Sequence, residues 1–201
     1  MRRRRIGRQM AKARVAALAK KGRKEPVKAE KRIQATSGFE RARAWLFVAA
    51  LLFCIVIEVG WEWREVNIIP PQIGGYRLHK TLHLGAICFF LFALLFQFGL
   101  RLPYCLVWHS YDIEWLRKLG GYTRRYSPVP PAGKYNAGQK LFTFFVLLFG
   151  LAYGISGLAM HLPQNLPPDI VRGAFNLHFI SFVVLVCGCL LYYYLFYAAT
   201  P

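Results

Sequence analysis

Acidic residues are scarce in this 201-residue chain and almost absent from its apolar segments. Nine Asp and Glu residues stand against 27 Lys and Arg, which gives a formal net charge of +18. Glu58 is the only carboxylate within the hydrophobic blocks described below. So basic a chain can bind nucleic acid, but here the basic residues flank apolar blocks and nothing resembles a base-reading fold. We therefore expect no nucleic-acid partner.

Two further absences narrow the possible classes of protein. The five cysteines include no CxxC pair and no CxxCH motif, which argues against a disulfide framework and a covalently attached haem. Most of them fall inside apolar blocks, so we interpret them as small buried hydrophobic residues. No internal repeat is present, which disfavours a small transporter built from repeated halves.

Hydrophobic residues make up 56% of the chain and are concentrated in a few long blocks. Each block is close to the ~20 residues that a membrane-spanning helix requires. The blocks are 44–61, 82–100, 141–160 and 174–198. The sequence therefore predicts an all-α membrane protein, a four-helix transmembrane bundle formed by residues 39–201, with both termini on the same side.

The distribution of Lys and Arg predicts which side that is. Residues 1–43 carry 16 Lys/Arg and 3 acids, and residues 101–140 carry 7 and 2; the connections 58–81 and 161–177 carry 3 and 1 Lys/Arg. Because excess Lys and Arg mark the cytoplasmic side, we expect both termini and the 101–140 loop to be cytoplasmic. Residues 1–38 are interpreted as a basic tail, disordered or lying on the membrane surface against anionic lipid head groups.

Histidines near the starts of two spans are the first candidates for a site. His79 and His83 begin the second span and His178 lies early in the fourth, so they enter the membrane from the same, outer side. Imidazoles at matching depth on facing helices are what a non-covalently bound b-type haem needs. The alternative is a pair of interfacial histidines that hydrogen-bond backbone or lipid head groups. Spacing alone leaves both open.

Several local motifs, in order, extend this interpretation. They are FERARAW at Phe39–Trp45, DIEWL and then GKYNAGQK in the inner loop, GLAMHLP at the end of the third span, and His178 early in the fourth. With these motifs, of which GKYNAGQK is the most specific, the chain from Phe39 onward resembles the cytochrome b (gamma) subunit of membrane-bound, quinone-linked formate dehydrogenases. The basic tail lies outside the resemblance.

The family that the chain resembles holds two b haems, but only the ligands of the outer haem are present in this sequence. The family's outer haem is ligated at positions that match His83 and His178, with His79 as the reserve for His83. The family's inner pair matches Ala44 and Tyr192 here, so both inner ligands are missing together. His109 is the only histidine on the inner side and cannot replace a pair. We therefore expect a single haem b in the outer leaflet.

The resemblance also implies a quinone site at the start of the third span. The matching residues are Asn136, Gly138 and Gln139, which would hold menaquinone or ubiquinone. The structural alternative is that this motif caps the third helix and fixes the preceding loop. From His178 to Tyr192, fourteen residues of helix correspond to about 21 Å, a long step for direct electron transfer between an outer haem and a quinone at Asn136.

The function implied is that of a membrane-anchoring, non-catalytic cytochrome b subunit of a respiratory oxidoreductase in the bacterial cytoplasmic (inner) membrane. It would carry electrons between an outer-face iron–sulfur subunit and the quinone pool or another membrane partner. The iron–sulfur subunit would receive these electrons from a molybdopterin or tungstopterin catalytic subunit. Two alternatives are a haem-free structural anchor of such a complex, and the equivalent subunit of a hydrogenase or other molybdopterin enzyme.

Overall fold

The computed structural model describes residues 37–62, 75–118, 120 and 132–195. This part of the chain contains helices and no strand. Four helices are long and apolar enough to cross a membrane, which confirms the predicted fold class. They are α2 (Gly38–Glu62), α3 (Gly75–Leu94), α6 (Ala137–His161) and α7 (Pro168–Tyr193). Nearly all of the predicted basic tail lies outside the described residues, and the cytoplasmic placement of the termini stays a prediction.

The helices extend beyond the predicted apolar blocks, chiefly at their starts. The second begins at Gly75 rather than at residue 82, because the polar turn that carries His79 continues the same helix. The fourth begins at Pro168 rather than at residue 174. Proline is favoured at the first helical position, where its missing N–H would have no helical partner. Hydropathy locates the apolar middle of each helix, and these polar turns precede it.

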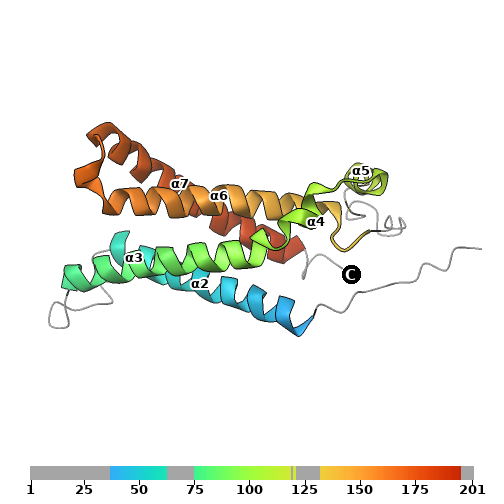
Figure 1. Cartoon of the computed structure of the whole chain (residues 1–201), viewed down its shortest axis with the longest axis horizontal. Helices are drawn as coiled ribbons and strands as arrows, with labels where there is room; N and C mark the ends of the chain where they lie inside the picture. The colour runs from blue at the N-terminus through green and yellow to red at the C-terminus, as the bar shows by residue number, and fades with distance from the viewer. Residues whose placement is uncertain (1–36, 63–74, 119, 121–131, 196–201) are drawn as a thin grey trace, which may run out of the picture. The chain divides into compact units, whose positions relative to one another are not determined.

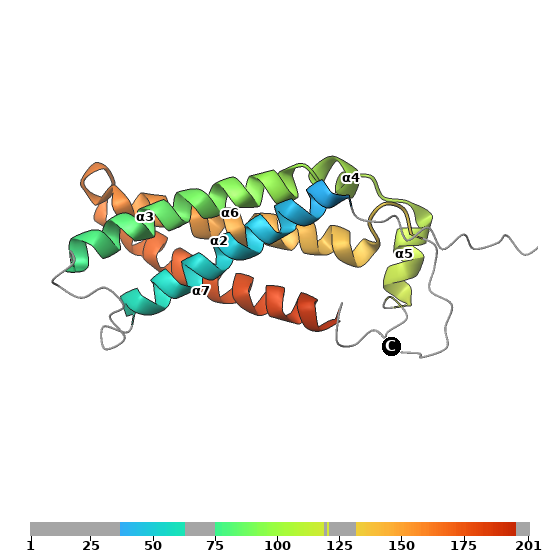
Figure 2. The ribbon, with the colours of Figure 1, turned by 90° about the horizontal axis from the view of Figure 1, so that it is seen from below.

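Each long helix packs against the long helix that follows it in the chain. Helix α3 packs against both α2 and α6, and α6 packs against α7 (Figures 1 and 2). Helix α7 is the least covered: 17% of its most apolar window is buried, against 39–44% for the other three. The largest side chains in the interior are fully buried; they are Phe90, Ile87, Leu94, Tyr153, Val146 and Leu185.

Glycines on α6 allow α3 and α7 to approach its backbone closely. A Cβ atom added at Gly157 would lie 2.6 Å from Ile87 Cδ1 on α3 and 2.7 Å from His178 Cε1 on α7. Small residues at helix interfaces permit such contact in membranes. Gly157 therefore provides the space that the His178 ring occupies.

We expect Gly157→Ala to destabilise the bundle by about 1–3 kcal/mol, because an extra methyl group in a well-packed interface forces its neighbours to shift. Gly85→Ala on α3 is the matched control, since a Cβ there meets nothing within 4 Å and alanine raises helix propensity by about 1 kcal/mol. Thermal unfolding of both variants in detergent tests this. Equal midpoints would contradict the close packing at Gly157.

Helix α3 continues into a π-helical turn, Leu95–Gly99, at the end of the bundle away from Glu58. The Arg43 side chain, which is buried on α2, donates from Nη1 to the Phe96 carbonyl within this turn at 3.1 Å. Two short helices follow, α4 (Leu102–Leu106) and α5 (Ser110–Arg117). Helix α5 contains the DIEWL segment of the inner loop.

A buried ion pair fixes α5 to the start of α6. Lys140 Nζ donates to Asp112 Oδ2 at 2.6 Å and to the Val107 carbonyl at 2.7 Å. The two charged side chains are 4% and 1% exposed. The Asp112 carboxylate also accepts the His109 backbone N–H at 2.9 Å. Each charge is thus compensated where it is removed from water.

Candidate functional site

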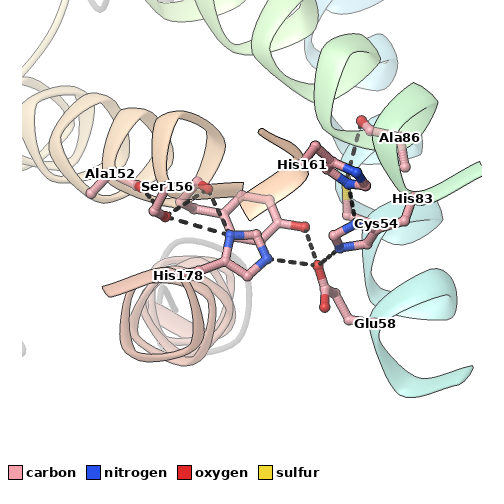
Figure 3. A network of polar contacts seen from close by, with 9 residues as sticks. Cys54, Glu58, His83, Ala86, Ala152, Ser156, His161 and His178 are labelled. Carbon is pink, nitrogen blue, oxygen red and sulfur yellow. Dashed lines mark hydrogen bonds and ion pairs between the residues drawn. The ribbon is translucent and has the colours of Figure 1, made fainter. Parts of the chain in front are cut away.

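Three ionisable side chains from three different helices meet inside the bundle (Figure 3). Glu58 lies near the end of α2, and His83 and His178 lie in early turns of α3 and α7. Glu58 Oε1 is 2.8 Å from His83 Nε2 and 3.0 Å from His178 Nε2. All three residues are buried, and the two imidazole centroids are 5.8 Å apart. We call these three residues the Glu58 cluster.

Helix α6 contributes Tyr153 to the surroundings of the cluster. Its hydroxyl donates to Glu58 Oε1 at 2.8 Å, and its ring stacks on the His178 ring at 4.4 Å between centroids. One carboxylate oxygen therefore faces three hydrogen-bond donors. Such contacts stabilise the ionised form of a buried carboxyl group.

The second nitrogen of each imidazole also has a partner. His178 Nδ1 is 2.8 Å from the Tyr153 carbonyl oxygen, and His83 Nδ1 is 3.0 Å from His161 Nε2. A carbonyl oxygen can only accept a hydrogen bond, so Nδ1 of His178 carries a proton. These contacts fix the orientation of both rings towards Glu58.

Glu58 Oε1 is the common partner of the cluster. It accepts from the Tyr153 hydroxyl and lies within hydrogen-bond distance of Nε2 of both imidazoles. Buried polar groups are stable when they are hydrogen-bonded in this way.

A cavity of about 590 Å³ adjoins the cluster, within the size range of small-molecule and cofactor sites. Glu58, His83 and His178 all line it. Its remaining wall is mainly apolar and comes from several helices; it includes Tyr76, Met160, Phe175, Phe179, Phe182 and Val183. Polar groups that converge beside an apolar wall are typical of cofactor sites.

The structure brings together two of the three predicted histidines. His83 and His178 share the cluster, whereas His79 is buried one turn away beside the Ile57 backbone. The sequence did not assign Glu58 to a site. The signal was available, because a lone carboxylate in a membrane span usually faces a functional partner.

In the opposite half of the bundle, where the resemblance implies an inner haem, aromatic rings from several helices contact one another. Tyr192 stacks on Phe142 with 3.8 Å between ring centroids. Phe142 contacts Phe98 at 6.1 Å, and Phe98 contacts Phe47 at 4.9 Å. These rings connect α7, α6, the π turn and α2 in sequence.

The predicted quinone motif forms the start of α6. Asn136 Oδ1 accepts the Gln139 backbone N–H at 2.8 Å, and Gln139 Oε1 accepts the Asn136 backbone N–H at 3.1 Å, which is a capping box. A Cβ atom at Gly138 would lie 2.6 Å from Trp115 Cη2. All three residues thus take part in capping α6 and fixing the preceding loop, which was the structural alternative to a quinone site. Quinone binding at them stays a prediction.

Comparisons with known proteins agree with the motif-based resemblance. The family model for prokaryotic cytochrome b561 matches residues 37–200. The cytochrome b556(Fdn) subunit of the nitrate-inducible formate dehydrogenase of Escherichia coli (strain K12) is 24% identical over 170 residues, which are 82% of this chain and 77% of that one. The subunits of the same name from Escherichia coli O157:H7 and Shigella flexneri give the same values. With its four apolar helices, the chain is a multi-pass membrane protein that belongs to the prokaryotic cytochrome b561 family.

Proposed function

We propose that this chain is the membrane-anchoring cytochrome b subunit of a respiratory oxidoreductase of the formate dehydrogenase type, and that it holds one b-type haem between His83 and His178. The observation that carries the proposal is the pair of buried imidazoles that α3 and α7 direct to one point. The family implies a b-type haem, and the relatives are formate dehydrogenase cytochrome subunits by name.

The residues at this site fit a haem on one condition. His83 and His178 would hold the haem iron, each through one imidazole nitrogen. A nitrogen of each histidine and an oxygen of Glu58 all lie within 4.8 Å of one another. The aromatic wall of the adjoining cavity offers apolar contact for a porphyrin. The condition is that the Glu58 carboxylate, which now bonds both nitrogens, moves out from between the rings.

The chain's own side chains would hold and orient such a group. The Tyr153 carbonyl keeps the proton of His178 on Nδ1 and so leaves Nε2 as the ligating atom. His161 fixes the His83 ring in the same way. When bound, haem supplies one-electron transfer.

The aromatic packing at the other end of the bundle supports one haem rather than two. Tyr192 lies against Phe142 where a second ligand would be required. His109, the remaining inner-side candidate, is exposed at the start of α5 and contacts Tyr111. We further propose that the complex lies in the bacterial inner membrane, with iron–sulfur and molybdopterin or tungstopterin subunits on the outer face, next to the Glu58 cluster.

The haem content of the purified complex tests the proposal. We expect a pyridine haemochrome assay to return one haem b per copy of this chain, and we expect iron–sulfur and molybdopterin subunits to copurify. Two haems per chain would overturn the one-haem assignment.

The alternative, a haem-free structural anchor, is favoured by one observation, the position of Glu58 between the two imidazoles. A complex that copurifies intact and gives no haem signal would support this anchor and reject the electron-transfer role.

A further inference from the structure

We propose that, in the absence of haem, Glu58, His83 and His178 bind a single divalent transition-metal ion such as Zn²⁺ or Fe²⁺. This inference goes beyond the proposed function and does not rest on it. It concerns a carboxylate that a haem site does not need, together with two imidazoles that the same carboxylate already bonds.

The donor set is one that proteins use for such ions. Two histidines and one glutamate bind Zn²⁺ in several hydrolases, and two histidines and one carboxylate bind Fe²⁺ in non-haem iron enzymes. All three donors are buried here, and they come from separate helices that packing holds in place. The site is therefore formed by the fold rather than by exposed, mobile side chains.

The separations between donor atoms suit a common ion. Donor atoms about 2.1 Å from one ion are about 3 Å apart at a right angle and about 3.4 Å apart at a tetrahedral angle. Glu58 Oε1 lies 2.8 Å and 3.0 Å from the two Nε2 atoms. Small shifts of these side chains suffice to admit the ion.

The surroundings also match those of a metal site. A histidine ligand usually donates its second N–H to a carbonyl or another acceptor, which fixes the ring and its tautomer. His178 does so to the Tyr153 carbonyl, and His83 has His161 as its partner at Nδ1. The Tyr153 hydroxyl holds the glutamate oxygen. The adjoining cavity provides room for water as a further ligand.

Binding of the ion changes the number of protons and the charge of the cluster. Each histidine binds an ion through an unprotonated Nε2 and stays neutral by keeping one proton on Nδ1. Any further proton that the two imidazoles or Glu58 hold before the ion binds is released to solvent. The cluster then carries a net charge of +1, which an anionic ligand such as hydroxide or chloride in the cavity would neutralise.

Haem and the metal ion place opposite requirements on Glu58. A haem requires the carboxylate to leave the line between the imidazoles, whereas the ion requires it as a ligand. The ion and the haem therefore exclude each other. Loss of the carboxylate should weaken binding of the ion and leave haem binding intact, and loss of His178 should abolish both.

Cobalt titration of the haem-free full-length chain in detergent tests the inference. Co²⁺ is the probe, because its visible absorption reports ligands directly, with bound metal counted by elemental analysis. We expect one Co²⁺ per chain, an affinity lowered more than about tenfold in Glu58→Gln, and no binding in His178→Ala. His109→Ala removes an exposed histidine instead and should bind like the wild type. Equal affinity of wild type and Glu58→Gln would overturn the proposal.

A second measurement needs no variant. A ligand that binds only the folded state raises its stability, so saturating Co²⁺ should raise the unfolding midpoint of the haem-free wild type. No shift, with no bound cobalt, would also overturn the inference. Haem and cobalt assays together distinguish the two proposals. If the wild-type complex holds haem but the haem-free chain binds no cobalt, only the ion proposal is rejected. If the chain binds cobalt but never carries haem, only the proposed function is rejected.

Discussion

Replacing His178 by alanine is expected to abolish the Soret absorption of the purified complex. His178 supplies one of two imidazoles at the site, and Gly157 and Tyr153 hold its ring in place. The methyl side chain of alanine leaves no ligand on α7 within reach of His83. The visible spectrum and the haemochrome assay would both fall from one haem per chain to near none.

Three further variants make this result specific. His83→Ala should also lose the absorption, whereas His79→Ala should keep it, because His79 lies outside the Glu58 cluster. His109→Ala should have no effect on the spectrum. A Soret band that survives in His178→Ala, or one that disappears in His79→Ala and not in His83→Ala, would show that the ligands are assigned wrongly.

Replacing Asp112 by asparagine is expected to destabilise the protein by about 3–5 kcal/mol, because it leaves the Lys140 ammonium buried without its counter-charge. Thermal or denaturant unfolding in detergent measures the loss. Glu114→Gln is the matched control. It breaks an ion pair with Lys118 on the same helix, but both side chains are well exposed, so a change of less than about 1 kcal/mol is expected.

The same carboxylate makes stability depend on pH. Burial alone would raise the pKa of Asp112, but the hydrogen bonds from Lys140 and from the His109 backbone outweigh it and hold the pKa below its usual range. Because the folded-state pKa is depressed, this stabilisation is present above the ordinary aspartate value of about 4. It is lost as the pH falls through the lowered value. Asp112→Asn should remove this acid-side dependence, and equal acid sensitivity in both proteins would contradict the assignment.

Hydropathy predicted the number and order of the membrane helices because each span must bury its backbone polar groups within itself. It did not predict where the helices begin. The first turns of α3 and α7 contain polar residues, and Pro168 occupies the first position of α7. Helix boundaries therefore depended on local signals that an average over a window removes.

The site was predicted in part for a similar reason. His83 and His178 were recognisable because ionisable side chains are rare in spans. The contacts of Glu58 with both of them depend on the rotation of α2 about its axis, which no local spacing in the sequence determines. Tyr153 was hidden because a tyrosine on an apolar helix is ordinary. Only the structure shows that its hydroxyl lies 2.8 Å from Glu58 Oε1 and so belongs to the site.

The π turn at Leu95–Gly99 has a consequence for comparing sequences. A π turn contains one residue more than an α turn, and each residue of an α-helix rotates the chain by about 100°. Counting backwards from the DIEWL segment across this turn therefore carries an error of one position unless the extra residue is included. In a relative that lacks the extra residue, the histidine face of α3 would be numbered one position differently while pointing in the same direction, so alignments of this helix need a gap within the turn rather than beside the histidines.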